Sequence, residues 1–184
     1  MSESVAAPAA VADLAVLRLD GETIDGFDPA RLDYEVDVDG GRLPAVDGIA
    51  IDSAATVRVT QATTANGGVA TVVVTSADGS ATRTYSVIIR RHAVIDGFAL
   101  ADRPRVGTPA SAVGAFDPAD GEIAWQWLRN GEPIQGATDA TYTPVTNDAG
   151  KLLSVRVTVS ADGVETATAE SDSQRILAAN SRKP

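Results

Sequence analysis

The chain has 184 residues, of which 44% are hydrophobic, and it carries a formal net charge of −10. The acidic excess argues against binding to nucleic acid or to an anionic membrane surface, because both need clustered Lys and Arg. The chain has no cysteine, which excludes disulfides and thiolate chemistry, and no stretch approaches the roughly 18 apolar residues that a membrane-spanning helix needs.

The first half of the chain predicts a series of short β-strands. Residues 1–12 are Ala-rich without periodicity and are predicted to be a linker. Apolar residues then alternate over 14–19, with one slip, and the clearest alternation follows at 34–38. Residues 57–59 predict a further strand. The segments 69–74 and 83–90 flank Asp78-Gly79, a pair typical of a hairpin turn.

The second half repeats this pattern and ends in a predicted tail at 178–184. Its predicted strands lie at residues 123–128, 141–143, 153–159 and 164–170. Turn signals recur roughly every 8–12 residues, and no segment has a convincing helical period. We therefore predict an all-β chain of two tandem immunoglobulin-like antiparallel β-sandwiches, at 13–91 and 92–177, with the boundary near His92.

The predicted first module resembles the cadherin-like β-sandwich domains of bacterial surface and secreted proteins. The resemblance rests on four segments: Leu17-x-Leu19-Asp-Gly21, Ile24-x-Gly26-Phe27-Asp28-Pro29, Tyr34-x-Val36-x-Val38 and Arg83-Thr-Tyr85-Ser-Val87. Gly26 and Pro29 bracket a turn that we expect to direct Phe27 inward, just before the strand that begins at Tyr34.

The predicted second module resembles the bacterial immunoglobulin-like repeats of actinobacterial secreted hydrolases. Its motifs are Trp125-Gln-Trp127-Leu-Arg-Asn-Gly131, Ile134-x-Gly136-Ala137-Thr138, Thr141-Tyr142 and Asp148-Ala-Gly150, followed by Lys-x-Leu-Ser-Val-Arg-Val-Thr158. Position 125 holds Trp where the family commonly has Tyr, and residues 101–120 fit the opening strands of the family poorly.

Both resemblances imply fold and context but no activity, because β-sandwiches serve many roles. Such modules accompany glycoside hydrolase, peptidase or adhesin domains in exported multidomain bacterial chains. They imply an extracellular or cell-surface location, with the export signal outside this sequence, and partners that are the neighbouring domains of the parent chain.

The residues themselves offer little for catalysis. The single histidine, His92, lies beside Arg90 and Arg91 at the predicted boundary, a poor setting for a general base. The carboxylates alternate outward along strands or sit in turns, which is typical of a solvated surface. We therefore predict no catalytic residues and no enzyme activity for the chain itself.

Calcium is the metal that Asp-rich turns could hold. The candidate ligands are Asp25 with Asp28 and Asp33, or Asp117 with Asp120. No EF-hand spacing occurs, and the acidic motifs by which cadherins bind calcium between domains are missing at the predicted boundary. We therefore expect no metal or other cofactor.

Carbohydrate binding would need exposed aromatic side chains that can stack on sugar rings. Trp125 and Trp127 are two residues apart and share one face of a strand. A Trp on this strand of an immunoglobulin-like sandwich packs in the core, which we expect of Trp127. Trp125 lies nearer the end of the sandwich, where it would be partly exposed, and is the candidate glycan contact.

The sequence thus favours a non-catalytic accessory or spacer function within a larger secreted or cell-surface bacterial protein, most simply a glycoside hydrolase. Two alternatives stay open. One is a carbohydrate- or cell-wall-binding module that uses Trp125, and the other is an adhesin stalk or protein-interaction module that uses an exposed strand edge.

Overall fold

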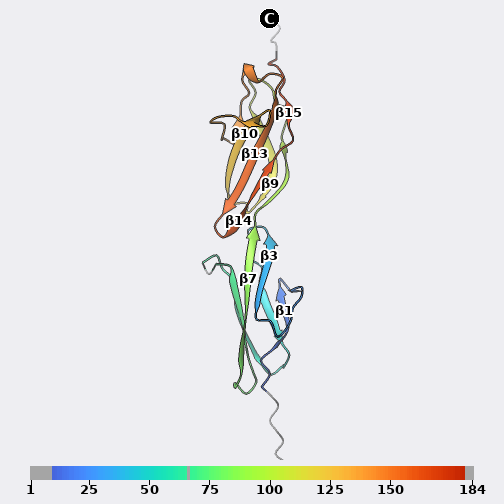
Figure 1. Ribbon diagram of the computed structural model, residues 1–184, viewed down its shortest axis with the longest axis vertical. Helices are drawn as coiled ribbons and strands as arrows, with labels where there is room; N and C mark the ends of the chain where they lie inside the picture. Colours follow the sequence, from blue (N-terminus) through green and yellow to red (C-terminus); the bar gives the residue numbers. More distant parts are fainter. Residues whose placement is uncertain (1–9, 66, 181–184) are drawn as a thin grey trace, which may run out of the picture. The chain divides into compact units, whose positions relative to one another are not determined.

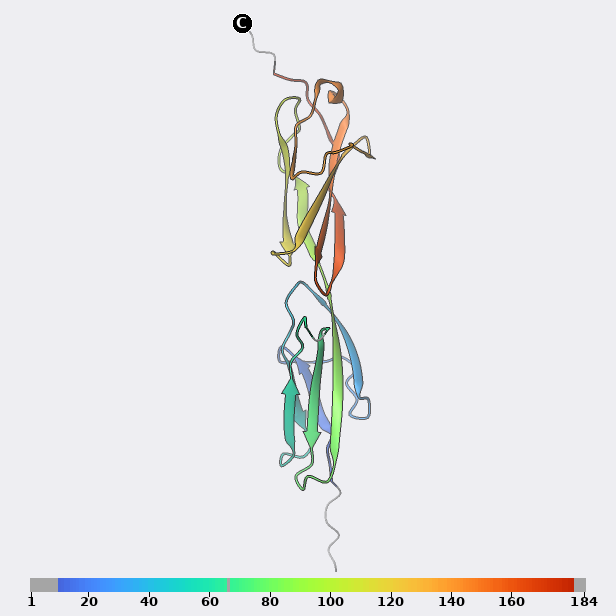
Figure 2. The same cartoon turned by 90° about the vertical axis from the view of Figure 1, so that its left-hand side faces the viewer.

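The computed structural model describes residues 10–65 and 67–180 (Figures 1 and 2). The predicted linker at 1–12 and the tail at 178–184 therefore lie largely outside the described residues. The described chain divides into two compact units. One holds the residues up to Val38 together with Arg42–Arg90, and the other holds Asp39–Gly41 and the residues from Arg91 onward. No described helix is long and apolar enough to cross a membrane.

The first unit is a sandwich of two sheets, with strand orders β2-β1-β4 and β3-β7-β6-β5. Figure 2 shows β5, β6 and β7, coloured from teal to light green, side by side. Strand β1 is antiparallel to β2 and β4, as β6 is to β5 and β7. The strand bounds are β1 (Leu14–Leu19), β2 (Glu22–Thr23), β3 (Asp33–Asp39), β4 (Val46–Ala50), β5 (Thr56–Thr60), β6 (Val69–Thr75) and β7 (Thr82–His92).

The core of the first unit follows from alternation. Along β6, Ala70, Val72 and Val74 are fully buried while the residues between them are partly exposed. Tyr85 of β7 is also fully buried. The 69–74 and 83–90 strands predicted around Asp78-Gly79 form this hairpin, as expected. Because each strand presents every second side chain to one face, the apolar residues of the two sheets meet in a single core.

The second unit divides its strands as an immunoglobulin-like sandwich does. One sheet has the order β11-β10-β13-β14, with β15 on β13, and the other has the order β12-β9-β8. The β8, β9 and β12 sheet corresponds to strands A, B and E of that fold, and the β10, β13 and β14 sheet corresponds to strands C, F and G. The bounds are β8 (Val94–Leu100), β9 (Ala110–Asp117), β10 (Glu122–Arg129), β11 (Glu132–Pro133), β12 (Thr141–Tyr142), β13 (Leu152–Ala161), β14 (Val164–Glu170) and β15 (Gln174–Arg175).

The central pair of the second unit is β10 with β13, which lie side by side in Figure 1. Leu153, Val155, Val157 and Val159 of β13 are fully buried, and so is Trp127 of β10. These side chains form a core separate from that of the first unit. The only helical segment among the described residues is a short 3-10 helix, η1 (Thr146–Asp148).

The all-β, immunoglobulin-like fold class predicted from the sequence is confirmed. The expected slip in the first strand is a register shift between Leu14 and Val16 in the pairing of β1 with β4. Strand β4 itself and the long hairpin of β8 and β9 were not assigned from the sequence. These segments lack a clean alternation, and β8 is interrupted by a further register shift between Asp96 and Ala99.

Candidate functional site

Trp125, the predicted glycan contact, belongs to a cluster of three aromatic rings. Its ring centroid lies 6.2 Å from that of Phe98 on β8 and 6.1 Å from that of Phe116 on β9. All three side chains are partly exposed. The rings come from both sheets and are mutually tilted, and Phe116 stands at 85° to Trp125. Trp125 is therefore anchored at the margin of the core, with only part of its ring open to a ligand.

Trp127 lies fully inside the second unit, as expected for this strand. Its indole Nε1 donates a hydrogen bond to the carbonyl of Asp139 at 2.9 Å, and its ring packs against Tyr142 with centroids 6.0 Å apart. A buried indole N–H needs such a partner. Trp127 thus stabilises the core, and no part of its ring is exposed to bind a sugar.

Asp148 is the polar group that the sequence did not reveal. The segment Asn147-Asp-Ala-Gly150 is typical of a turn, in which an aspartate is commonly solvated, yet Asp148 is fully buried. It accepts hydrogen bonds from Arg129 Nη1 at 2.6 Å, from the Tyr142 hydroxyl at 2.7 Å and from the amide of Val145 at 2.9 Å. These three donors hold η1 against β10 and β12.

The hydrogen bonds to the carboxyl group of Asp148 determine the direction in which its pKa shifts. Burial alone would raise the pKa of Asp148, but the hydrogen bonds from Arg129, Tyr142 and Val145 together outweigh burial and lower it. Burial and the hydrogen bond to Asp148 raise the pKa of Tyr142 to about 12. A carboxylate with this many fixed donors stabilises the fold and is poorly placed to accept a proton from a substrate.

Two of the aspartates considered for calcium, Asp28 and Asp117, make hydrogen bonds within the fold. Asp28 caps its own turn, with Oδ1 accepting from the amide of Ala30 at 2.9 Å. Asp117 Oδ1 accepts from the amide of Gly41 at 2.8 Å. Over residues 10–65 and 67–180, no three Asp, Glu or His side chains converge in a way that could hold a metal ion.

His92 takes part in a pair across two strands. Its Nδ1 lies 3.0 Å from Glu165 Oε2, and the two residues face each other where the end of β7 pairs in parallel with β14. The histidine side chain is about one-third exposed, 34%. This geometry is that of a side-chain contact between two paired strands.

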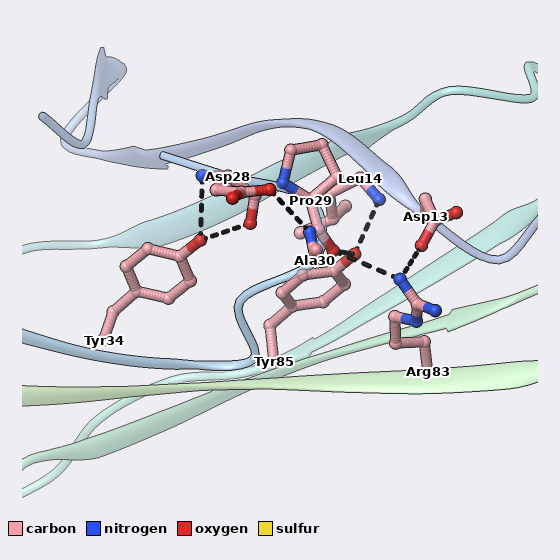
Figure 3. Close-up of polar contacts among 8 residues, drawn as sticks. All are labelled: Asp13, Leu14, Asp28, Pro29, Ala30, Tyr34, Arg83 and Tyr85. Carbon is pink, nitrogen blue, oxygen red and sulfur yellow. Dashed lines mark hydrogen bonds and ion pairs between the residues drawn. The ribbon is translucent and has the colours of Figure 1, made fainter. Parts of the chain in front are cut away.

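Two tyrosines fix the turn of the first unit that was predicted around Phe27. The Tyr34 hydroxyl donates to the carbonyl of Asp28 at 2.6 Å and accepts from its amide at 3.1 Å (Figure 3). Phe27 packs against the core, stacks on Tyr34 with ring centroids 5.8 Å apart, and contacts the tilted ring of Tyr85 at 6.3 Å. The expected inward position of Phe27 is confirmed.

Tyr85 performs the same task from β7. Its hydroxyl donates to the carbonyl of Pro29 at 2.9 Å and accepts from the amide of Leu14 at 3.1 Å (Figure 3). Arg83 pairs with Asp13 beside it. In the described part of the chain, every buried side-chain nitrogen and oxygen has a hydrogen-bond partner, so these polar groups are used in folding.

An open groove of about 540 Å³ lies in the first unit between β3 and the paired strands β1 and β2. Its apolar lining comes from side chains that also pack on the core, and exposed carboxylates surround them. No sequence pattern indicates this groove, because it depends on the spacing between β3 and strands with which β3 does not pair. Its lining residues are Leu19, Glu22, Thr23, Ile24, Asp25, Glu35, Val36, Asp37 and Val38.

Comparison with known proteins gives a relative by sequence. No family model matches the chain. Over 118 residues the chain is 42% identical to an exo-beta-1,6-galactobiohydrolase of Bifidobacterium longum subsp. longum, a match that covers 61% of this chain and 7% of that enzyme. The chain is thus related to a small part of a bacterial glycoside hydrolase.

Several of the solved structures that the chain resembles contain immunoglobulin domains. They include the N-terminal four immunoglobulin domains of Dscam1 isoform 9.44, with a TM-score of 0.41 and 12% identity over 92% of this chain and 47% of that chain. Isoform 6.9 gives a TM-score of 0.39 and 13% identity over 94% and 47%. The fold assignment rests on the strand order and the cores described above.

Proposed function

We propose that this chain is a non-catalytic accessory part of a larger exported bacterial glycoside hydrolase. The observation that carries the proposal is its 42% identity to a segment that makes up only 7% of a far longer hydrolase. A segment of that size is too short to represent the whole enzyme. The sequence resemblances add that the first module is cadherin-like and the second is of the actinobacterial immunoglobulin-like type.

The proposed mechanism is mechanical. Each unit has its own buried core, which supports two modules that fold separately. We place the boundary between the two modules at residues 91 and 92. The net charge of −10 keeps such an array soluble beside its neighbouring domains. The proposed partners are those domains.

We propose that the chain requires no cofactor. Addition of EDTA should therefore leave its melting temperature unchanged, whereas a clear drop in melting temperature would indicate bound calcium.

Deletion in the related enzyme tests the accessory role. We would remove the segment homologous to this chain from the Bifidobacterium galactobiohydrolase and measure kcat/KM on a soluble oligosaccharide, together with the melting temperature. An accessory segment predicts a nearly unchanged kcat/KM with altered stability or altered action on polymeric substrate. Restoration of those properties by inserting this chain would support the proposal. Loss of catalysis on the soluble substrate by a well-folded deletion variant would overturn it.

A second candidate function is glycan binding at Trp125. The observation that favours it is the cluster of Trp125, Phe98 and Phe116, in which every ring keeps an exposed part. Stacking on a sugar contributes affinity only through such exposed ring surface. Pull-down on insoluble polysaccharides tests it: retention that disappears in Trp125→Ala, with the melting temperature checked, would favour binding, and no retention would exclude these polysaccharides as ligands.

A further inference from the structure

We propose that the groove between β3 and the β1–β2 pair in the first unit docks an extended, cationic segment of a partner protein, which adds a strand to β3. This interaction surface goes beyond the accessory function. It combines the open edge of β3 with an apolar floor and an acidic rim, and each feature limits which segments can bind. The floor is Leu19, Ile24, Val36 and Val38, and the rim is Glu22, Asp25, Glu35 and Asp37.

The open edge comes from the position of β3 in its sheet. Among the strands in the described residues, β3 pairs only with β7. The carbonyl of Leu32, just before β3, accepts from the amide of Ser86 on β7. Successive residues of a strand direct their backbone groups to opposite sides, so the N–H and C=O of Glu35 point away from β7. An extended peptide can pair with such an edge.

The floor selects aliphatic side chains. Leu19, Ile24, Val36 and Val38 line the groove and are each partly buried against the core. The groove, at about 540 Å³, is large enough for a few aliphatic side chains. Every second residue of an added strand would point toward this floor.

The rim selects positive charge. Glu22, Asp25, Glu35 and Asp37 line the groove, and all four are exposed. Glu35 already pairs with Arg90 on β7, whereas no ion pair within the described residues engages Glu22 or Asp25. The remaining residues of an added strand would therefore be Lys or Arg, which gives a segment that alternates basic and aliphatic residues.

A second copy of this chain is a poor occupant. Pairing β3 with β3 would bring Glu35 and Asp37 against the same carboxylates of the other copy, and like charges directly opposite each other destabilise a sheet. Acidic side chains on an edge strand can also serve only to prevent such pairing. If the acidic side chains only prevent edge pairing, a cationic strand should not bind. A binding experiment therefore separates this role from the proposed docking site.

The test uses the intact chain and a fluorescent peptide of alternating Lys and Val. We expect saturable binding by fluorescence anisotropy, with amide chemical-shift changes confined to β1, β2 and β3. A peptide with every second backbone nitrogen methylated should bind much more weakly, because it cannot form the added ladder. Equal binding of the methylated peptide, or no saturable binding at millimolar concentration, would overturn the proposal.

Matched double variants separate the groove from net charge. Glu22→Gln with Asp25→Asn should weaken binding by about three- to tenfold, since each exposed ion pair contributes modestly. The control, Asp47→Asn with Asp102→Asn, removes the same charge from exposed sites outside the groove and should leave binding nearly unchanged. Equal weakening by both pairs would mean non-specific attraction and would contradict the assigned site.

Discussion

Trp127 and Trp125 are two residues apart on one strand, yet their burial differs. Trp127 is fully buried and hydrogen-bonded, whereas Trp125 remains partly exposed. Trp127→Ala should therefore lower the free energy of unfolding by about 3–5 kcal/mol, and Trp125→Ala by clearly less. Urea unfolding measures both, and equal costs would contradict the assignment of the two side chains.

Asp148 makes stability depend on pH. Its folded-state pKa lies below its unfolded value, so its contribution is present above about pH 4 and is lost as pH falls through the folded pKa. Asp148→Asn should cost about 1.5–3 kcal/mol at pH 6, the range for hydrogen bonds to a charged group. The difference from the parent chain should shrink toward pH 2.5 in urea melts. A difference that did not change with pH would show that the carboxylate charge is unimportant.

The same residues show what sequence can and cannot reveal about a site. The burial of Trp127 followed from its place on a predicted strand. The burial of Asp148 did not, because an Asn-Asp-Ala-Gly segment is typical of a solvated turn and its partner Arg129 lies 19 residues away. The partial exposure of Trp125 was expected from a position near the end of the sandwich. Its contacts with Phe98 and Phe116 were not expected, because those residues lie on strands that were not assigned.

Among the strands, the local sequence pattern predicted where a strand lies better than which strand it pairs with. The β6–β7 hairpin was identified because alternation and an Asp-Gly turn agree. The pairing of β3 with β7 joins segments about 50 residues apart and leaves no local signal. The groove lies between β3 and strands with which β3 does not pair, so no local sequence pattern indicates it.

The start of the β6–β7 hairpin offers a test with a matched control. Gly68 has φ +76°, and a Cβ there would lie 2.6 Å from the carbonyl oxygen of Ile89, whereas Gly79 has φ +71° and open space around it. Both Gly→Ala changes strain the backbone by about 1–2 kcal/mol. Gly68→Ala should cost more by urea unfolding because it also collides with β7, and equal costs would contradict the close approach of these strands.

At the scale of the whole molecule, the two separate cores predict separable unfolding. Val72→Ala in the first unit and Trp127→Ala in the second should each shift a different calorimetric transition. The two effects should add in the double variant, because distant sites with no shared partners are independent. A single transition that both changes shift equally would instead indicate one cooperative domain.

If the chain has no catalytic machinery of its own, it should release no product from a glycan substrate. The intact chain would be incubated with β-1,6-linked galacto-oligosaccharides, with the Bifidobacterium galactobiohydrolase as the positive control. We predict no products above the buffer blank at any concentration of the chain. Product formation that rises in proportion to the purified chain would contradict the accessory function.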